Sequence, residues 1–260
     1  MKTPNEFATL LEKHLRPATF PIGVKLIKPG GELPSRCKRP KANLGVQIAL
    51  CQSITFARRY GWTLAVAESD LNCPLALTAF GYKPELDYYS SGCACGGMYT
   101  ESNDGGAKTE ADVPKFSFKE YEYFVCGALA RISFEPDVVI QYGNSAQVMR
   151  LLQASLWHDG GYLTSRFSGR LDCADMVIET MQTGKPQVIL PCYGDRVFAQ
   201  TGDDEMAFSL PWSWAERIEE GLAGTHKGGI RYPIPNFMRY QPQFPGHYNK
   251  MHELWDEQTS

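Results

Sequence analysis

The sequence has no long hydrophobic run and no strong charge of either sign. No stretch approaches the roughly 18 uninterrupted apolar residues of a membrane-spanning helix. Acidic residues soon interrupt the N-terminal segment, which argues against a signal peptide. The formal net charge of -3 creates no field that would gather nucleic acid or an anionic membrane surface. We therefore expect a cytoplasmic protein with neither of these partners.

The familiar catalytic motifs are also missing. The sequence contains no H-E-x-x-H, no G-x-S-x-G, no Walker loop and no G-x-G-x-x-G. It has only five histidines, and no two of them have the spacing of a helical metal site. These absences exclude the sequence signatures of the corresponding protease, hydrolase and nucleotide-binding classes. They leave cysteine as the main candidate for chemistry.

Hydrophobic periodicity predicts alternating helices and strands. Apolar residues recur at helical spacing in 4–16 and 44–60, and Pro74 after Cys73 is typical of a helix start. Further helices are expected at 144–161, 173–182 and 212–224. Strands are expected at 20–28, 62–67, 120–143, 162–169, 186–192 and 204–211, with a turn at 194–196.

This alternation predicts an α/β fold with a mixed sheet and flanking helices. We expect a single compact domain, 1–260, which is long enough to bury a large core. Two helical regions also repeat at an offset of one hundred residues, which aligns Cys73 with Cys173. This echo is as compatible with chance as with a duplication into two pseudo-symmetric fused halves, 1–115 and 116–260.

Two segments lack regular periodicity. Residues 82–115 are rich in glycine, serine, aspartate and tyrosine, and we expect them to form a long functional loop. The last 30 residues are rich in proline and aromatic residues, and we expect them to wrap over the core as irregular structure.

The eight cysteines carry the functional argument. The cytosol keeps thiols reduced, so these cysteines are buried hydrophobes, reactive thiols or metal ligands. Cys73 and Cys173 stand at expected helix starts, where free N–H groups and the helix dipole stabilise a thiolate. Cys93 and Cys95 form a C-x-C pair in a glycine-rich loop, where the backbone can approach a cluster closely.

The other cysteines are more ambiguous. Cys51 lies on an amphipathic helix, where burial and ligation are equally compatible with the pattern. Cys126 is expected to be buried, and Cys192 ends a strand from which it could face either the core or a site. Cys37 is expected to be exposed, with a pKa lowered by its basic neighbours. Arg196, in a polar turn, could contact an anionic cofactor or brace Asp195.

Several of these segments resemble a known family, the domain of unknown function 169, from PIGVKL to KGGIRYPIP. The specific stretches are PDVVIQYGNSAQVMRLLQA and GDRVFAQTGDDEM. The matching positions are Cys51-Gln52, Cys73-Pro74, Cys173, Gly194-Asp195-Arg196 and the strand that ends at Pro211. The resemblance implies a distribution largely among archaea and anaerobic bacteria, which fits an oxygen-sensitive metal centre.

We therefore expect an iron–sulfur protein of the 4Fe-4S type, with an electron-transfer or redox role in anaerobic metabolism and a redox partner protein. Cys51, Cys73 and Cys173 would supply three ligands and Cys93 or Cys95 the fourth. A zinc protein is the first alternative, because thiolates suit zinc equally well. A metal-free binding module is the second, with its pocket drawn from Tyr88, Tyr89, Tyr99, Trp212 and Trp214. A homo-oligomer is compatible with all three.

Overall fold

A computed structural model of the chain describes residues 3–234, 238 and 241–259. The strands are β1 (Ile22–Ile27), β2 (Leu64–Val66), β3 (Tyr123–Ala128), β4 (Val138–Asn144), β5 (Gln187–Ile189) and β6 (Glu205–Pro211). The α-helices are α1 (Pro4–Leu15), α2 (Leu50–Tyr60), α3 (Pro74–Ala79), α4 (Asp87–Ser90), α5 (Asn103–Asp112), α6 (Ser145–Ser155), α7 (Asp172–Ala174), α8 (Thr180–Thr183), α9 (Tyr193–Ala199), α10 (Ala215–Lys227) and α11 (Gly246–Thr259). Shorter helical segments of other types are η1 (Pro40–Leu44), η2 (Glu68–Asp70), η3 (Asp175–Glu179) and η4 (Trp212–Trp214).

The six strands form one open sheet in the order β2-β3-β1-β4-β6-β5. Every pairing between these strands is antiparallel. The two central strands meet over a short register, with Ile22 opposite Ile140 and Val24 opposite Val138. The predicted α/β class with flanking helices is confirmed. The sheet, which we expected to be mixed, is antiparallel in every pairing between its six strands.

The strand order has an internal two-fold pattern. The first three strands lie, from the sheet edge inward, in the order β2, β3, β1. The last three lie, again from the edge inward, in the order β5, β6, β4. In both sets, the strand that comes second along the chain lies at the edge and the third lies beside it. The first strand of each set lies at the centre, where β1 and β4 pair antiparallel. We call these sets the first and second halves of the sheet; they divide between Ala128 and Val138, after the predicted boundary at 115.

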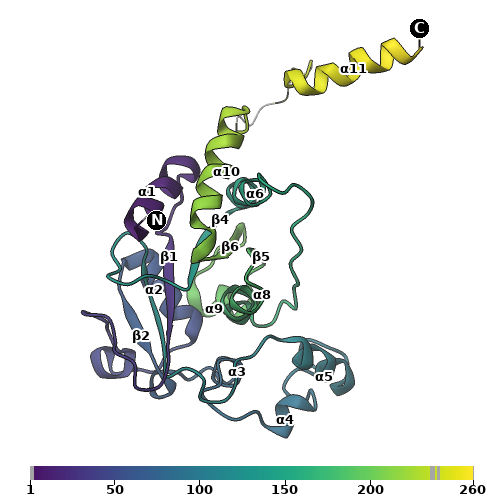
Figure 1. Cartoon of the computed structure of the whole chain (residues 1–260). Coiled ribbons are helices and arrows are strands. Elements are labelled where there is room, and N and C mark those ends of the chain that lie inside the picture. The colour runs from purple at the N-terminus through teal and green to yellow at the C-terminus, as the bar shows by residue number, and fades with distance from the viewer. Residues whose placement is uncertain (1–2, 235–237, 239–240, 260) are drawn as a thin grey trace.

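Helices cover both faces of this sheet (Figure 1). Because successive strand residues point to opposite faces, Val138 and Ile140 belong to one apolar cluster and Val139 to another. The first cluster packs the sheet against α2, α3 and the helix formed by α7, η3 and α8. The second packs it against α1, α6 and α10. Figure 1 shows α11 standing off the body of the protein.

The contact between α6 and α10 depends on Gly221. A Cβ atom at this position would lie 2.1 Å from the carbonyl oxygen of Ala154. Gly221→Ala is therefore expected to lower the free energy of unfolding by about 1–3 kcal/mol through overpacking, although alanine favours helices. Denaturant unfolding would measure it. Gly246→Ala, with nothing within 4 Å of the added Cβ, is the control, and equal stability of the two variants would contradict the expectation.

Most of the predicted helices and strands are confirmed, but one boundary and two element types are wrong. The helix predicted from residue 44 begins at Leu50, because Gly45 takes a left-handed conformation with φ 73° and Ile48 pairs as a bridge with Leu71. The turn predicted at 194–196 lies within α9. Residues 162–169 form no strand, and Tyr162 is 96% exposed.

The two segments predicted to be irregular contain helices. Residues 82–115 include α4 and α5, and Ser102 caps α5 by accepting a hydrogen bond from the Gly105 amide. The last 30 residues include α11, and residues 235–237, 239–240 and 260 lie outside the described part. Within the described part, no helix is both long enough and apolar enough to cross a membrane.

Candidate functional site

A cavity of about 660 Å³ lies among the helices on one face of the sheet, and four cysteines line it. They are Cys51, Cys73, Cys173 and Cys192. The other lining residues belong to α2, α3, α7 and α9, to the residues just before these helices, or to the segment after α3. They are Gln47, Ala49, Leu50, Gln52, Asn72, Pro74, Leu75, Ala76, Met98, Tyr99, Arg170, Leu171, Asp172, Tyr193, Gly194, Asp195 and Phe198. The structure thus brings together three of the predicted ligands and adds Cys192.

Two of these cysteines occupy equivalent places in the two halves of the sheet. Cys51 is the second residue of α2, and Cys173 is the second residue of α7. The helix α2 ends at Gly61, and the continuous helix formed by α7, η3 and α8 ends at Gly184. Both glycines are left-handed, with φ 69° and φ 63°, and an edge strand follows each of them. A π-helical segment in the second copy accommodates its extra residue.

The other two cysteines are equivalent in the same sense. After the edge strand, Cys73 is the N-cap residue of α3 in the first half, and Cys192 is the N-cap residue of α9 in the second. The helices then pack across the halves, since α2 contacts α9 and α3 contacts α7. Each pair of contacting helices therefore carries one cysteine from each half to the cavity.

This arrangement corrects the predicted echo. The offset of one hundred residues aligned Cys73 with Cys173, but Cys73 follows an edge strand whereas Cys173 precedes one. The topology instead relates Cys51 to Cys173 and Cys73 to Cys192. A single residue offset misses this relation because the two pairs are 122 and 119 residues apart, so no one offset aligns both.

Cys93 and Cys95, the predicted sources of the fourth ligand, do not line the cavity. The Cys93 sulfur accepts hydrogen bonds from the Ser91 hydroxyl and the Asn103 amide, both at 3.3 Å. Cys95 is fully buried, where Gly106 packs against its Cβ. The glycine-rich loop reaches the cavity through other side chains, those of Met98 and Tyr99.

Three further predicted positions lie away from the cavity. Arg196 donates a hydrogen bond to the Gly202 carbonyl. Cys126 is buried in β3, as predicted, and donates to the Ser53 carbonyl at 3.4 Å. Cys37 is half-buried rather than exposed, and burial raises its pKa instead of the basic neighbours lowering it.

Two buried carboxyl groups lie beside the cysteines. Asp172 and Asp195 are 2% and 0% exposed, and both line the cavity. The Cys192 thiol donates to Asp172 Oδ1 at 3.1 Å. Asp195 Oδ2 accepts hydrogen bonds from Tyr142 at 3.1 Å and Thr201 at 2.9 Å. Burial, followed by the neighbouring Asp172 charge, raises the pKa of Asp195 to about 8, so this group is mostly protonated at neutral pH.

Burial also favours the protonated form of three of the thiols, those of Cys51, Cys173 and Cys192, when no metal is bound. Burial raises the pKa of Cys192 to about 12, with Asp172 as the second cause. The same two effects raise the pKa of Cys173, and burial with the nearby carboxylates raises that of Cys51. A thiol is a poor nucleophile and a thiolate is the metal ligand. Metal binding here would therefore release protons.

The cysteines surround the cavity rather than converge on one point. Among the described residues, no three His, Cys, Asp or Glu side chains are close enough together to hold a single metal ion. Electrostatic coupling nevertheless links the thiols, because Cys73, Cys51 and Cys192 all act on the pKa of Cys173. The four thiols thus share one electrostatic environment.

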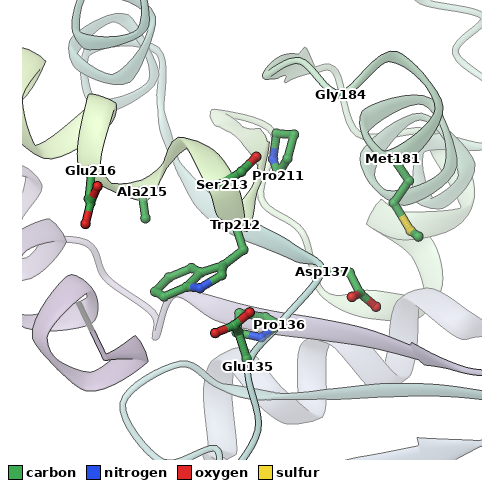
Figure 2. A pocket seen from close by; sticks show the side chains of 10 residues that line it. All are labelled: Glu135, Pro136, Asp137, Met181, Gly184, Pro211, Trp212, Ser213, Ala215 and Glu216. Atoms are coloured by element: carbon green, nitrogen blue, oxygen red, sulfur yellow. The ribbon is translucent and has the colours of Figure 1, made fainter. Parts of the chain in front are cut away.

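A second cavity, of about 600 Å³, has a different character. Its lining combines Trp212 with three carboxylates, those of Glu135, Asp137 and Glu216, and contains no cysteine or histidine. Figure 2 shows these side chains around the Trp212 indole, with Met181 on the far side of Asp137. We take the cysteine-lined cavity as the candidate site, because only its lining carries thiols.

Sequence reasoning missed Arg170 and Asp172 and left Cys192 undecided. The available signal was the run Arg170 to Cys173, which places two charged residues directly before a predicted ligand. For Cys192, its position at the end of a strand did not show whether the side chain points into the core or toward a site. The pairing of the two halves decides this, and it is not visible from local spacing.

Comparisons with known proteins agree with the resemblance noted in the sequence. The chain is 27% identical over 210 residues to an uncharacterised protein of Methanocaldococcus jannaschii, covering 77% of this chain and 85% of that protein. No solved structure matches. The model of the family DUF169, described as uncharacterised ArCR, matches residues 10–221, which include all four cavity cysteines. The chain therefore belongs to the DUF169 family.

Proposed function

We propose that the cavity holds an iron–sulfur cluster of the 4Fe-4S type, ligated by Cys51, Cys73, Cys173 and Cys192, with an electron-transfer or redox role. The observation that carries this proposal is the position of the four thiols. Two come from each half of the sheet, and all four line one cavity. Four cysteine thiolates are the usual ligand set of such a cluster.

The arrangement of the thiols is compatible with a cluster. Each thiolate of a cluster binds a different iron atom, so the four ligands lie farther apart than around one metal ion. Among the described residues no group of side chains is arranged to hold one metal ion, and four cysteines line a common cavity.

The carboxyl groups of Asp172 and Asp195 are compatible with this proposal because burial favours their neutral forms. A cluster with four thiolates carries negative charge, which ionised carboxylates would oppose. Burial raises the pKa values of both Asp172 and Asp195. A neutral carboxylic acid adds no charge and can donate a hydrogen bond to a sulfur. Hydrogen bonds to sulfur and solvent exposure set the reduction potential of such clusters.

The test is the metal content of the full chain purified without oxygen. We expect iron and acid-labile sulfide in equal amounts, about four of each per chain, with broad visible absorption from thiolate-to-iron charge transfer. Oxygen should bleach this absorption. A protein that binds neither iron nor sulfide after anaerobic reconstitution would contradict the proposal.

A zinc site is the second candidate, and one contact favours it. Asp172 Oδ1 lies 3.1 Å from the Cys192 sulfur, so an oxygen and a sulfur donor are already adjacent. Zinc accepts thiolate and carboxylate ligands in the same tetrahedral shell. Stoichiometric zinc in a colourless protein, without sulfide, would select this candidate over the cluster.

A further inference from the structure

Arg170 is a buried cation with hydrogen-bonding capacity to spare. Its side chain is 2% exposed, and it is the only lysine or arginine among the residues lining the cavity. A guanidinium has five N–H donors. Nη2 donates to the Ala94 carbonyl at 2.9 Å and to Glu110 Oε1. Nε and Nη1 have no acceptor among the described residues.

The residues that the Arg170 side chain contacts all belong to one segment, which has no equivalent in the second half. Ala94, Tyr99 and Glu110 lie between α3 and β3, and Figure 1 shows this segment, with α4 and α5, at one end of the molecule. The Tyr99 ring lies 5.1 Å from the guanidinium carbon and also lines the cavity. The thiols therefore follow the two-fold pattern, whereas Arg170 and its segment break it on one side.

Leaving buried N–H groups without acceptors destabilises a fold, and more so when the groups are charged. A ligand with oxygen acceptors in the cavity would remove that cost. The carboxylate of Glu110 already balances the single positive charge of Arg170. A singly charged group therefore suits the site better than a phosphate dianion.

We infer that the free N–H groups of Arg170 bind the carboxylate of a small-molecule substrate inside the cysteine-lined cavity. This inference rests on the proposed function for the chemistry that the substrate would meet there, whereas the binding of the carboxylate rests on Arg170 alone. Tyr99 would cover the guanidinium face and leave its edge for the ligand.

The test is a titration of the full chain with acetate and, separately, with inorganic phosphate, followed by calorimetry or amide chemical shifts. Saturable acetate binding is expected. Glu110→Gln keeps an acceptor for Nη2 but removes the balancing charge, so it should strengthen acetate binding by several-fold. Arg170→Met in the Glu110→Gln background avoids an unpaired buried carboxylate, and it should weaken binding at least roughly tenfold, the loss of a charged hydrogen bond.

The outcomes separate this inference from the cluster. The double variant Cys51→Ser/Cys73→Ser should lose metal and still bind acetate, since it keeps Arg170. No saturable acetate binding in either the unmodified chain or Glu110→Gln would overturn the inference. So would binding that Glu110→Gln leaves unchanged, or that survives Arg170→Met. Phosphate binding tighter than acetate binding would overturn the choice of a carboxylate. None of these results depends on iron content.

Discussion

Replacing Arg58 by methionine is expected to lower the free energy of unfolding by about 3 kcal/mol or more, because it leaves one partner of a buried ion pair without the other. Arg58, in α2, is fully buried. Its Nη1 lies 2.7 Å from Glu205 Oε1, and its Nη2 donates to Thr201 at 3.1 Å. Its guanidinium also stacks on the Tyr142 ring at 4.1 Å. All three partners belong to the second half, so Arg58 joins the halves directly behind the candidate site.

The neighbouring arginine provides a matched control. Arg59 belongs to the same helix and contacts the same carboxylate at 3.5 Å, but its side chain is 33% exposed. Exposed ion pairs contribute roughly 0–1 kcal/mol. Arg59→Met is therefore expected to change the free energy of unfolding by less than about 1 kcal/mol. Chemical denaturation of both variants gives the comparison, and similar losses in the two would show that burial is not the deciding factor.

The pH dependence of stability offers a second readout of the same pair. Burial opposes the ionisation of Glu205, but hydrogen bonds from Arg58 and the Gly202 amide outweigh it and lower its pKa. A carboxyl with a lowered folded-state pKa stabilises the fold above its unfolded-state pKa and stops doing so as the pH falls through the folded-state value. The unmodified chain should therefore lose this contribution below about pH 4.3, and Arg58→Met should lose less of it.

Replacing Cys192 by serine is expected to remove most of the iron and the visible absorption from anaerobically purified protein. Cys192 caps α9 at the cavity, and serine is a poor ligand for iron–sulfur clusters. Cys93→Ser is the control, because the sequence pattern favoured Cys93 as a ligand whereas the structure places its sulfur against Ser91 and Asn103. It should retain its metal. Iron lost on Cys93→Ser and kept on Cys192→Ser would reverse our ligand assignment.

The same comparison shows what the sequence could predict. Helices such as 4–16 follow from local apolar spacing, and α1 begins and ends within one residue of the expected positions. The segment 82–115 was misjudged because α5, with two glycines and weak amphipathicity, gives little helical signal. Tertiary contacts hold it instead, including the pair between Glu110 and Arg170. Such contacts join residues far apart in sequence and leave no local pattern.

The site residues also divide into those that local spacing could predict and those that depend on contacts between distant residues. Cys73 and Cys173 were identifiable because each stands at an expected helix start, a property of a few neighbouring residues. Cys51 was expected in the middle of a helix over 44–60, and it reaches a helix start only because α2 begins at Leu50. The choice between Cys192 and the C-x-C pair required the order of the strands. That order depends on the pairing of β1 with β4, which brings together residues more than a hundred positions apart.

The pairing of β1 with β4 also bears on how such a protein could arise. A shorter polypeptide with the strand order of one set alone would leave its first strand as an open edge, ready to pair with a second molecule. A symmetric homodimer formed that way would cover the edge through an isologous contact. It would also gather two cysteines from each subunit around a shared chamber. Fusion of the two genes would then free one copy to acquire an insertion, and the segment bearing Tyr99 and Glu110 is present here on one side only.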